Sequence, residues 1–299
     1  MKHKNLKKEI IKNIDSYLML APFMLFFTVF TVIPVIMAFP MGFTDFDGTN
    51  MPSFSGFSNF KALFMSDRVF MKSMGNTLKI AVFTGPVSYI ISFMLAWLIN
   101  ELKPFWQSFF TLLFYIPSMA NLYAVWKIIF SGDEYGYLNS FLINTGILAY
   151  PVQWLTDSRY TMWIVIIVQM WMSSGAGFLA MSAGFKSIDR SQYEAGAVEG
   201  ISNRWQALFY ITIPSMKPQL LFAGIMQIIS AFTSDIAGRS LAGFPSTDYS
   251  VHTVMTHAYD YGWVRFEMGY ASAVCTVLFA VMFLSERIVN RLFGTNDQE

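Results

Sequence analysis

The sequence is poor in cysteine, histidine and charged side chains. Its 299 residues include one cysteine, Cys275, and three histidines. One cysteine excludes an intrachain disulfide and any metal cluster held by several thiolates. Only 13% of the residues are charged and 55% are hydrophobic, whereas a soluble domain has roughly 25% charged residues. This composition predicts an integral membrane protein.

Further absences exclude whole classes of function. A net charge of +1 without a dominant basic face argues against a nucleic-acid partner. The chain has no Gly-x-x-x-x-Gly-Lys-Ser/Thr stretch, so it has no phosphate-binding loop of its own. It has no Gly-x-Ser-x-Gly turn, and His252 and His257 lie in a loop without a further ligand for zinc. We therefore expect no catalytic residue, no metal and no cofactor in this chain.

Six apolar stretches are long enough to cross a bilayer. A spanning helix needs about 20 mostly apolar residues, because lipid offers the backbone no hydrogen-bond partner. The first stretch follows several lysines, but it is longer than the roughly 7–15 apolar residues of a signal peptide. We expect an all-α, single-domain membrane protein over residues 1–299. Its expected spans are 17–39, 74–99, 109–130, 162–184, 220–236 and 269–289. Kinks are expected at Pro22, Pro34, Pro86 and Pro117.

Basic residues are more frequent on one side of these spans than on the other. Lysine and arginine concentrate on the cytoplasmic side of bacterial membrane proteins. With the N-terminus inside, the inner side holds Lys2, Lys4, Lys7, Lys8, Lys12, Lys103, Lys186, Arg190, Arg204, Lys217, Arg287 and Arg291. The outer side holds Lys61, Arg68, Lys72, Arg159, Arg239 and Arg265. The bias predicts a multi-pass protein of a bacterial-type plasma membrane, with both termini and a large loop, about 185–218, in the cytoplasm.

The inner loop contains a polar segment between long apolar ones. From Ile188 to Arg204 it mixes charged, apolar and small residues, which predicts a short amphipathic helix ending near Gly200. Such a helix can lie flat on lipid. The small residues 195–197 beside Glu194 favour a protein contact instead, because they allow another backbone to approach and the carboxylate can pair with a basic partner.

The loop contains a motif of residues in a fixed order. It consists of Glu194, Ala195, Gly196, Glu199 and Gly200, then Ile211, Ile213, Pro214, Lys217 and Pro218. The order resembles the cytoplasmic coupling loop of ABC importer permeases that work with a binding protein. Gly196 stands where that family usually has a second alanine, and Glu199 where it usually has aspartate. Further matches to the sugar-importer branch are 75–77, Trp126, Gly136, Leu138, Asn139 and 269–273.

The resemblance implies a type I ABC importer permease that passes a carbohydrate, expected to be an oligosaccharide, into the cytoplasm. Its expected partners are a second permease subunit in a heterodimer, two cytosolic ATPase subunits, an extracytoplasmic solute-binding protein and membrane lipid. ATP and Mg²⁺ would bind the ATPase, not this chain. The residues implied to dock on the ATPase are Glu194, Ala195, Gly196, Glu199 and Gly200.

Polar side chains in the fourth and fifth spans indicate a path for a polar solute. Such a path needs hydrogen-bonding groups that face the interior of the bundle, because they are costly in lipid. The fifth span places three on one helix face, and the fourth places two in the same relation beside a tryptophan. The candidates are Gln227, Ser230, Ser234, Gln169, Ser173 and Trp171. The same groups can equally hold helices together, so both interpretations stay open.

Two other classes of function are consistent with the span pattern. One is a gradient-driven transporter or channel whose polar loop is a helix on the lipid surface. The spans lack a row of buried carboxylates or basic residues, which argues against a proton-driven antiporter. The other is a membrane scaffold that transports nothing. Copurification of an ATPase with the chain would separate the importer from both.

Overall fold

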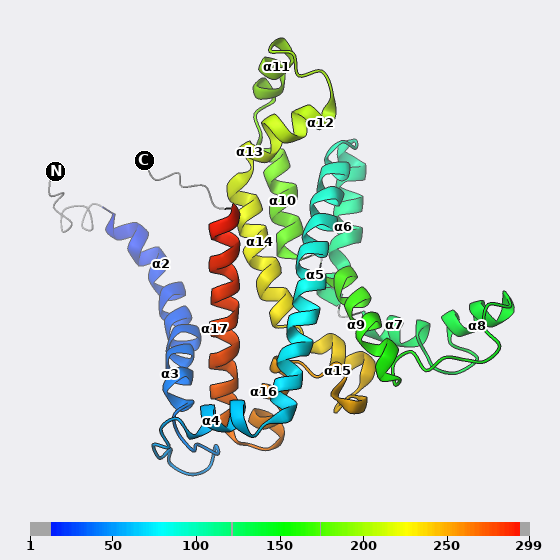
Figure 1. Ribbon diagram of the computed structural model, residues 1–299. Coiled ribbons are helices and arrows are strands. Elements are labelled where there is room, and N and C mark those ends of the chain that lie inside the picture. Colours follow the sequence, from blue (N-terminus) through cyan, green and yellow to red (C-terminus); the bar gives the residue numbers. More distant parts are fainter. Residues whose placement is uncertain (1–12, 121, 174, 294–299) are drawn as a thin grey trace.

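The computed structural model describes residues 13–120, 122–173 and 175–293, which form a helical bundle with helical caps at both ends (Figure 1). In these ranges the only β pairing is a single bridge between Thr44 and Phe54. Within the described part of the chain, four helices are long and apolar enough to cross a membrane. Two bent helix pairs raise the number to six if each pair is one span.

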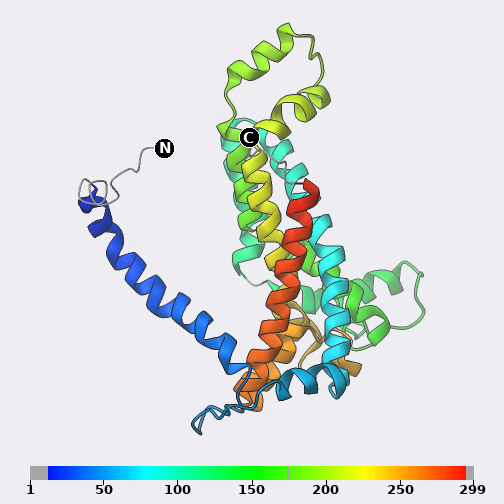
Figure 2. The ribbon, with the colours of Figure 1, turned by 60° about the vertical axis from the view of Figure 1, so that its left-hand side comes forward.

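The N-terminal helix forms an arm that contacts the bundle at its C-terminal end and diverges from it toward the N-terminus (Figures 1 and 2). It consists of α2 (Ile14–Phe27), η1 (Thr28–Val32) and α3 (Ile33–Met41). None of its residues is buried, although its mean hydropathy is the highest of the four long helices. The π-helical turn η1 ends two residues before Pro34. In a regular α-helix a proline ring clashes with the carbonyl four residues earlier, and the wider π-helical turn moves that carbonyl away from the ring. The basic residues Lys2, Lys4, Lys7, Lys8 and Lys12, which support the predicted orientation, lie outside the described residues.

Three helices pack against one another at the centre of the bundle. They are α5 (Arg68–Asn100), α10 (Ala176–Ser187) and α14 (Lys217–Phe232). Helix α17 (Met268–Phe293) packs along α14, and α9 (Ser158–Met172) packs against α5. Where the central helices meet, Trp97, Phe178, Met181 and Met216 are buried in one apolar cluster. Burial of these large side chains stabilises the contact between the three helices.

Three of the expected spans are broken helices, among them the span expected over 162–184, because α9 ends at Met172 and α10 begins at Ala176. Helix α6 (Pro104–Ala120) is followed by α7 (Tyr123–Ile129) at 89°, three residues after Pro117, for which the sequence predicts a kink. Helix α14 ends at Phe232 and is followed by α15 (Ile236–Ala242) at 41°. The single helix expected over 220–236 is therefore interrupted before its end.

The short elements gather at the two ends of the bundle (Figure 1). One end carries α11 (Arg190–Val198), α12 (Arg204–Ala207), η2 (Leu208–Thr212) and α13 (Ile213–Ser215). The opposite end carries α4 (Ser58–Met65), η3 (Thr247–Tyr249), α16 (Val254–Tyr259) and η4 (Asp260–Val264). Helix α8 (Tyr137–Asn144) projects sideways beyond α7. The start of α2 and the end of α17 lie toward the end that carries α11 (Figures 1 and 2).

Candidate functional site

The loop singled out in the sequence forms helix α11, as predicted, with a capping signal at each end. The Asp189 carboxylate accepts a hydrogen bond from the backbone N–H of Ser191 at 2.9 Å, and this bond lowers the pKa of Asp189. At the other end Gly200 has φ +97. The N–H of Ile201 donates to the carbonyl of Gly196 at 2.9 Å, which completes a Schellman stop. The helix boundaries therefore follow from residues within the loop itself.

Helix α11 projects from the end of the bundle and presents most of the predicted docking residues to its surroundings (Figure 1). Glu194, Ala195, Glu199 and Gly200 are exposed. Gly196 differs, because it is buried against η2: an added Cβ would lie 2.6 Å from Cδ1 of Ile211. Because Gly196 is small, α11 packs closely on η2 of the same chain. The close approach of a partner, which the sequence predicts for residues 195–197, is therefore left to Ala195 and Ala197, which are exposed.

Two side-chain hydrogen bonds hold α11 on the segment that leads into α14. The hydroxyls of Tyr193 and Thr212 are 2.9 Å apart, and the Ser215 hydroxyl donates to Gln192 at 2.7 Å. Beside these contacts lies a groove of about 520 Å³. It is lined by Gln192, Ala195, Gly196, Glu199, Ile201, Tyr210, Ile211 and Ser215. The helix is thus a braced projection with a groove at its base.

A second cavity, of about 330 Å³, lies between the end of α6, the break between α9 and α10, and α14. It is lined by Tyr115, Ser118, Met119, Tyr123, Gln169, Met172, Ser173, Gly175, Ala176 and Ser230. The structure brings together three of the six predicted pathway residues here: Gln169, Ser173 and Ser230. Gln169 is 7% exposed, and its Oε1 has no hydrogen-bond partner among the described residues. An unpaired buried acceptor facing a cavity suits a ligand that donates a hydrogen bond.

The other three predicted pathway residues lie elsewhere. Gln227 is buried between helices, with its Nε2 3.5 Å from both Ser92 Oγ and the carbonyl of Ser173. Ser234 lies in the break after α14, so the prediction that it continues one helix face is wrong. Trp171 packs edge-to-face on Trp126, with ring centroids 5.3 Å apart. These positions support helix packing for Gln227 and Trp171.

The cavity also contains polar residues that the sequence analysis missed. Tyr115, Ser118 and Tyr123 come from α6 and α7. Single hydroxyls within a long apolar stretch gave no pattern that could identify them. The nearest signal was Pro117, which lies inside α6 three residues before its end and predicts a kink close to these polar groups.

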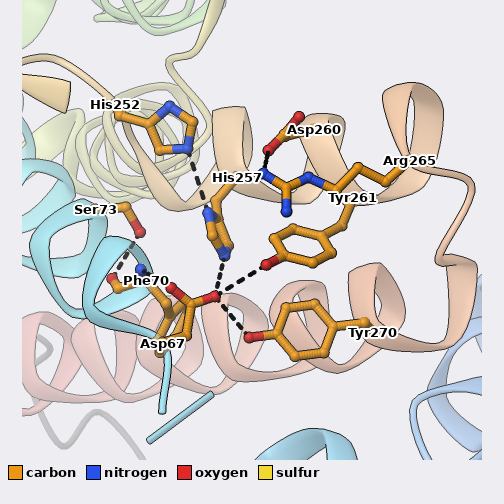
Figure 3. A network of polar contacts seen from close by, with 9 residues as sticks. All are labelled: Asp67, Phe70, Ser73, His252, His257, Asp260, Tyr261, Arg265 and Tyr270. Carbon is orange, nitrogen blue, oxygen red and sulfur yellow. Dashed lines mark hydrogen bonds and ion pairs between the residues drawn. The ribbon is translucent and has the colours of Figure 1, made fainter. Parts of the chain in front are cut away.

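At the opposite end of the bundle, a buried network surrounds Asp67 (Figure 3). The Asp67 carboxylate caps α5 through the N–H of Phe70 at 2.8 Å. It also accepts from the hydroxyl of Tyr270 at 2.7 Å and from Nε2–H of His257 at 3.0 Å. Nδ1 of His257 is then free to accept from Nε2–H of His252 at 3.3 Å. This chain joins the beginning of α5 to α16 and α17.

Burial and hydrogen bonding shift the titration of these groups in known directions. Burial lowers the pKa of His252 to about 4, and it also lowers the pKa of His257. Burial alone would raise the pKa of Asp67, but the hydrogen bonds from Phe70, Tyr270 and His257 outweigh it and lower the pKa. At neutral pH the network therefore holds one carboxylate and two neutral imidazoles. No group of three metal-ligating side chains occurs within the described ranges.

Comparison with known proteins gives one consistent result. Residues 88–295 match the family described as binding-protein-dependent transport system inner membrane component. The lactose transport system permease protein LacF of Rhizobium radiobacter is 30% identical over 220 residues, covering 73% of this chain and 72% of that protein. The arabinooligosaccharides transport system permease protein AraP of Bacillus subtilis is 27% identical over 287 residues, covering 95% and 90%.

A solved structure of similar fold comes from a bacterial ABC transporter involved in the import of the acidic polysaccharide alginate. It superposes with a TM-score of 0.72 at 23% identity, over 98% of this chain and 100% of that chain. At this identity the likeness shows the fold alone.

Proposed function

Because the chain belongs to the family of binding-protein-dependent transport system inner membrane components, we propose that it passes an oligosaccharide from an extracytoplasmic binding protein into the cytoplasm. Family membership makes it a multi-pass permease subunit of an ABC transporter, not an enzyme. The carbohydrate cargo is supported by the names of relatives that transport lactose and arabinooligosaccharides. ATP and Mg²⁺ belong to a separate ATPase in this proposal.

The proposed assembly contains a second permease subunit, two cytosolic ATPase subunits and the binding protein. In this proposal each bent helix pair is one span, so that the chain has six spans and both termini lie on the same side of the membrane. The distribution of basic residues assigns that side to the cytoplasm. The start of α2 and the end of α17 lie toward α11, which supports this topology (Figure 1). The arm of α2 and α3 offers an unburied apolar surface for the second permease and for lipid.

The observation that carries the proposal is the geometry of α11. A short capped helix projects from the bundle with Glu194 and Glu199 exposed. Two exposed carboxylates suit basic residues on an ATPase surface. The helix is braced on the segment that leads directly into α14, a central helix of the bundle. A force applied to α11 by the ATPase therefore acts on the membrane helices.

The cavity at Gln169 supports a neutral sugar as the cargo. Hydroxyl and amide groups line it beside Tyr115 and Tyr123, and no charged side chain is among its described lining residues. Sugar hydroxyls can donate to Gln169 Oε1, while the tyrosine rings offer apolar faces to the sugar ring. We assign the start of the pathway inside the bundle to this cavity.

Copurification and uptake test the proposal together. The tagged chain is isolated from its native membranes, and the complex is reconstituted in vesicles with its binding protein. We expect an ATPase to copurify, and lactose, arabinotriose or maltotriose to be taken up only when ATP is supplied. Uptake by the chain alone without ATP would establish a gradient-driven transporter instead. Uptake of an alginate trisaccharide alone would refute the neutral cargo.

The docking residues are tested by Glu194→Lys combined with Gly200→Arg. The variant should insert normally but lose sugar-stimulated ATP hydrolysis, because the carboxylate is reversed and a large side chain blocks the end of α11. A matched control is Glu134→Lys with Gly146→Arg, which changes an exposed carboxylate and another positive-φ glycine near α8. Unchanged hydrolysis in the first variant would contradict the assigned docking surface.

A further inference from the structure

The segment after α11 is fastened to the end of α5. Nη2 of Arg204 lies 2.9 Å from Oε2 of Glu101, the residue that follows α5. The neighbouring ring of Trp205 lies 4.9 Å from the ring of Trp97, at an interplanar angle of 59°. A charge pair and an aromatic pair thus join the same two elements side by side.

The junction formed by Arg204, Trp205, Glu101 and Trp97 has a buried side and an exposed side. Trp97 is 8% exposed and belongs to the apolar cluster at the centre of the bundle. Trp205 is 51% exposed, and the side chains of Arg204 and Glu101 are 63% and 33% exposed. Exposed ion pairs contribute little to folding stability. The Arg204–Glu101 ion pair therefore adds little to the stability of the bundle, and together with the Trp97–Trp205 contact it joins α12 to the end of α5.

The junction lies next to the brace of α11. Helix α12 continues without interruption into η2, and η2 contains Thr212, which contacts Tyr193 of α11. A displacement of α11 is therefore passed through η2 to α12. From α12 it reaches α5, which packs against both α10 and α14.

We propose that Arg204, Trp205, Glu101 and Trp97 form a coupling clamp that transmits the displacement of α11 to α5. This inference rests on the proposed function, because the displacement comes from the ATPase. The four residues are positioning residues: they contact neither the cargo nor ATP. Without the clamp, α11 would still bind the ATPase and still act on α14, but its displacement would no longer reach α5 directly.

A charge exchange tests the clamp in the complete reconstituted complex. Arg204→Glu and Glu101→Arg each place two like charges at the junction, and the double variant restores an opposite pair. We expect each single variant to transport about two- to fivefold less sugar per ATP hydrolysed, the range expected for an exposed ion pair. The double variant should recover most of the loss. Lys103→Glu, an exposed charge change close to Glu101, is the control and should behave as wild type.

The measurements are uptake of whichever of lactose, arabinotriose and maltotriose the wild-type complex transports, ATP hydrolysis, ATPase copurification and melting temperature. A coupling clamp predicts a lower transport-to-hydrolysis ratio with unchanged copurification and melting temperature. Single variants with a wild-type ratio would overturn it, as would a double variant that recovers nothing. Loss of the ATPase in the single variants would assign Arg204 and Glu101 to docking instead. A wild-type complex without ATP-driven uptake would count against the proposed function itself.

Discussion

Removing the Asp67 carboxylate should destabilise the end of the molecule that carries α16. In Asp67→Ala, the N–H of Phe70 loses its cap, which typically costs about 1 kcal/mol. His257 and Tyr270 lose their shared acceptor, and an unsatisfied buried donor costs about 1–3 kcal/mol. Because the Asp67 side chain is 11% exposed, water can reach part of the site. The expected loss of folding stability is therefore at the lower end of the sum of the cap and the two unsatisfied donors, about 3 kcal/mol.

Thermal unfolding of the purified complex measures this loss. For a domain of this size, about 3 kcal/mol corresponds to a decrease of about 6 °C in the melting temperature. Asp67→Asn keeps one acceptor oxygen and should lose about half as much. Asp157 caps α9 in the same way, but its partner is an exposed arginine. Asp157→Ala is therefore the matched control, with a smaller expected shift. Equal shifts for the two alanine variants would refute the claim that the buried donors matter.

Three further predictions concern pH, the coupling loop and the cavity. In the folded protein the pKa of His252 is lowered from 6.5 to about 4. Above pH 6.5 this residue is neutral in both the folded and the unfolded state, so folding stability should be greatest there. About 3 kcal/mol should be lost as the pH falls toward 4, and His252→Gln should flatten this dependence in thermal unfolding. Gly200→Ala strains a residue with φ +97 and should lower sugar-stimulated hydrolysis by about fivefold or more, whereas Gly146→Ala, with φ +76, should leave hydrolysis unchanged. Gln169→Met removes an unpaired acceptor, so the melting temperature should hold while sugar uptake falls; unchanged uptake would remove Gln169 from the pathway.

The coupling loop was predictable because its signals are local. Asp189 and Gly200 mark the two ends of α11, where the hydrogen bonds span only a few residues. The residue types alone therefore indicate the helix and its ends. The packing of Gly196 on Ile211 was not predictable in the same way. It depends on η2 returning beside α11, and sequence spacing does not specify that contact.

The polar residues of the bundle were only partly predictable. Helical spacing placed Gln169 and Ser173 on one face, and both line one cavity in the structure, because Ser173 directly follows α9 and keeps helical backbone angles. The same argument failed for Ser234, because α14 ends at Phe232. Spacing carries information only while the helix continues, and the position of a break depends on how the next segment packs.

The sequence by itself determined the class of protein, the apolar stretches, the capped helix in the inner loop and the resemblance to a permease family. These features depend on composition and on interactions between residues close in the chain. Only the tertiary structure decided that His257 is a buried partner of Asp67, which lies 190 residues before it, and that His252 in turn contacts His257. It likewise decided which hydroxyls share the cavity and that Arg204 meets Glu101. Burial and pairing of polar groups depend on packing between distant segments, and this packing is settled only when the whole bundle forms.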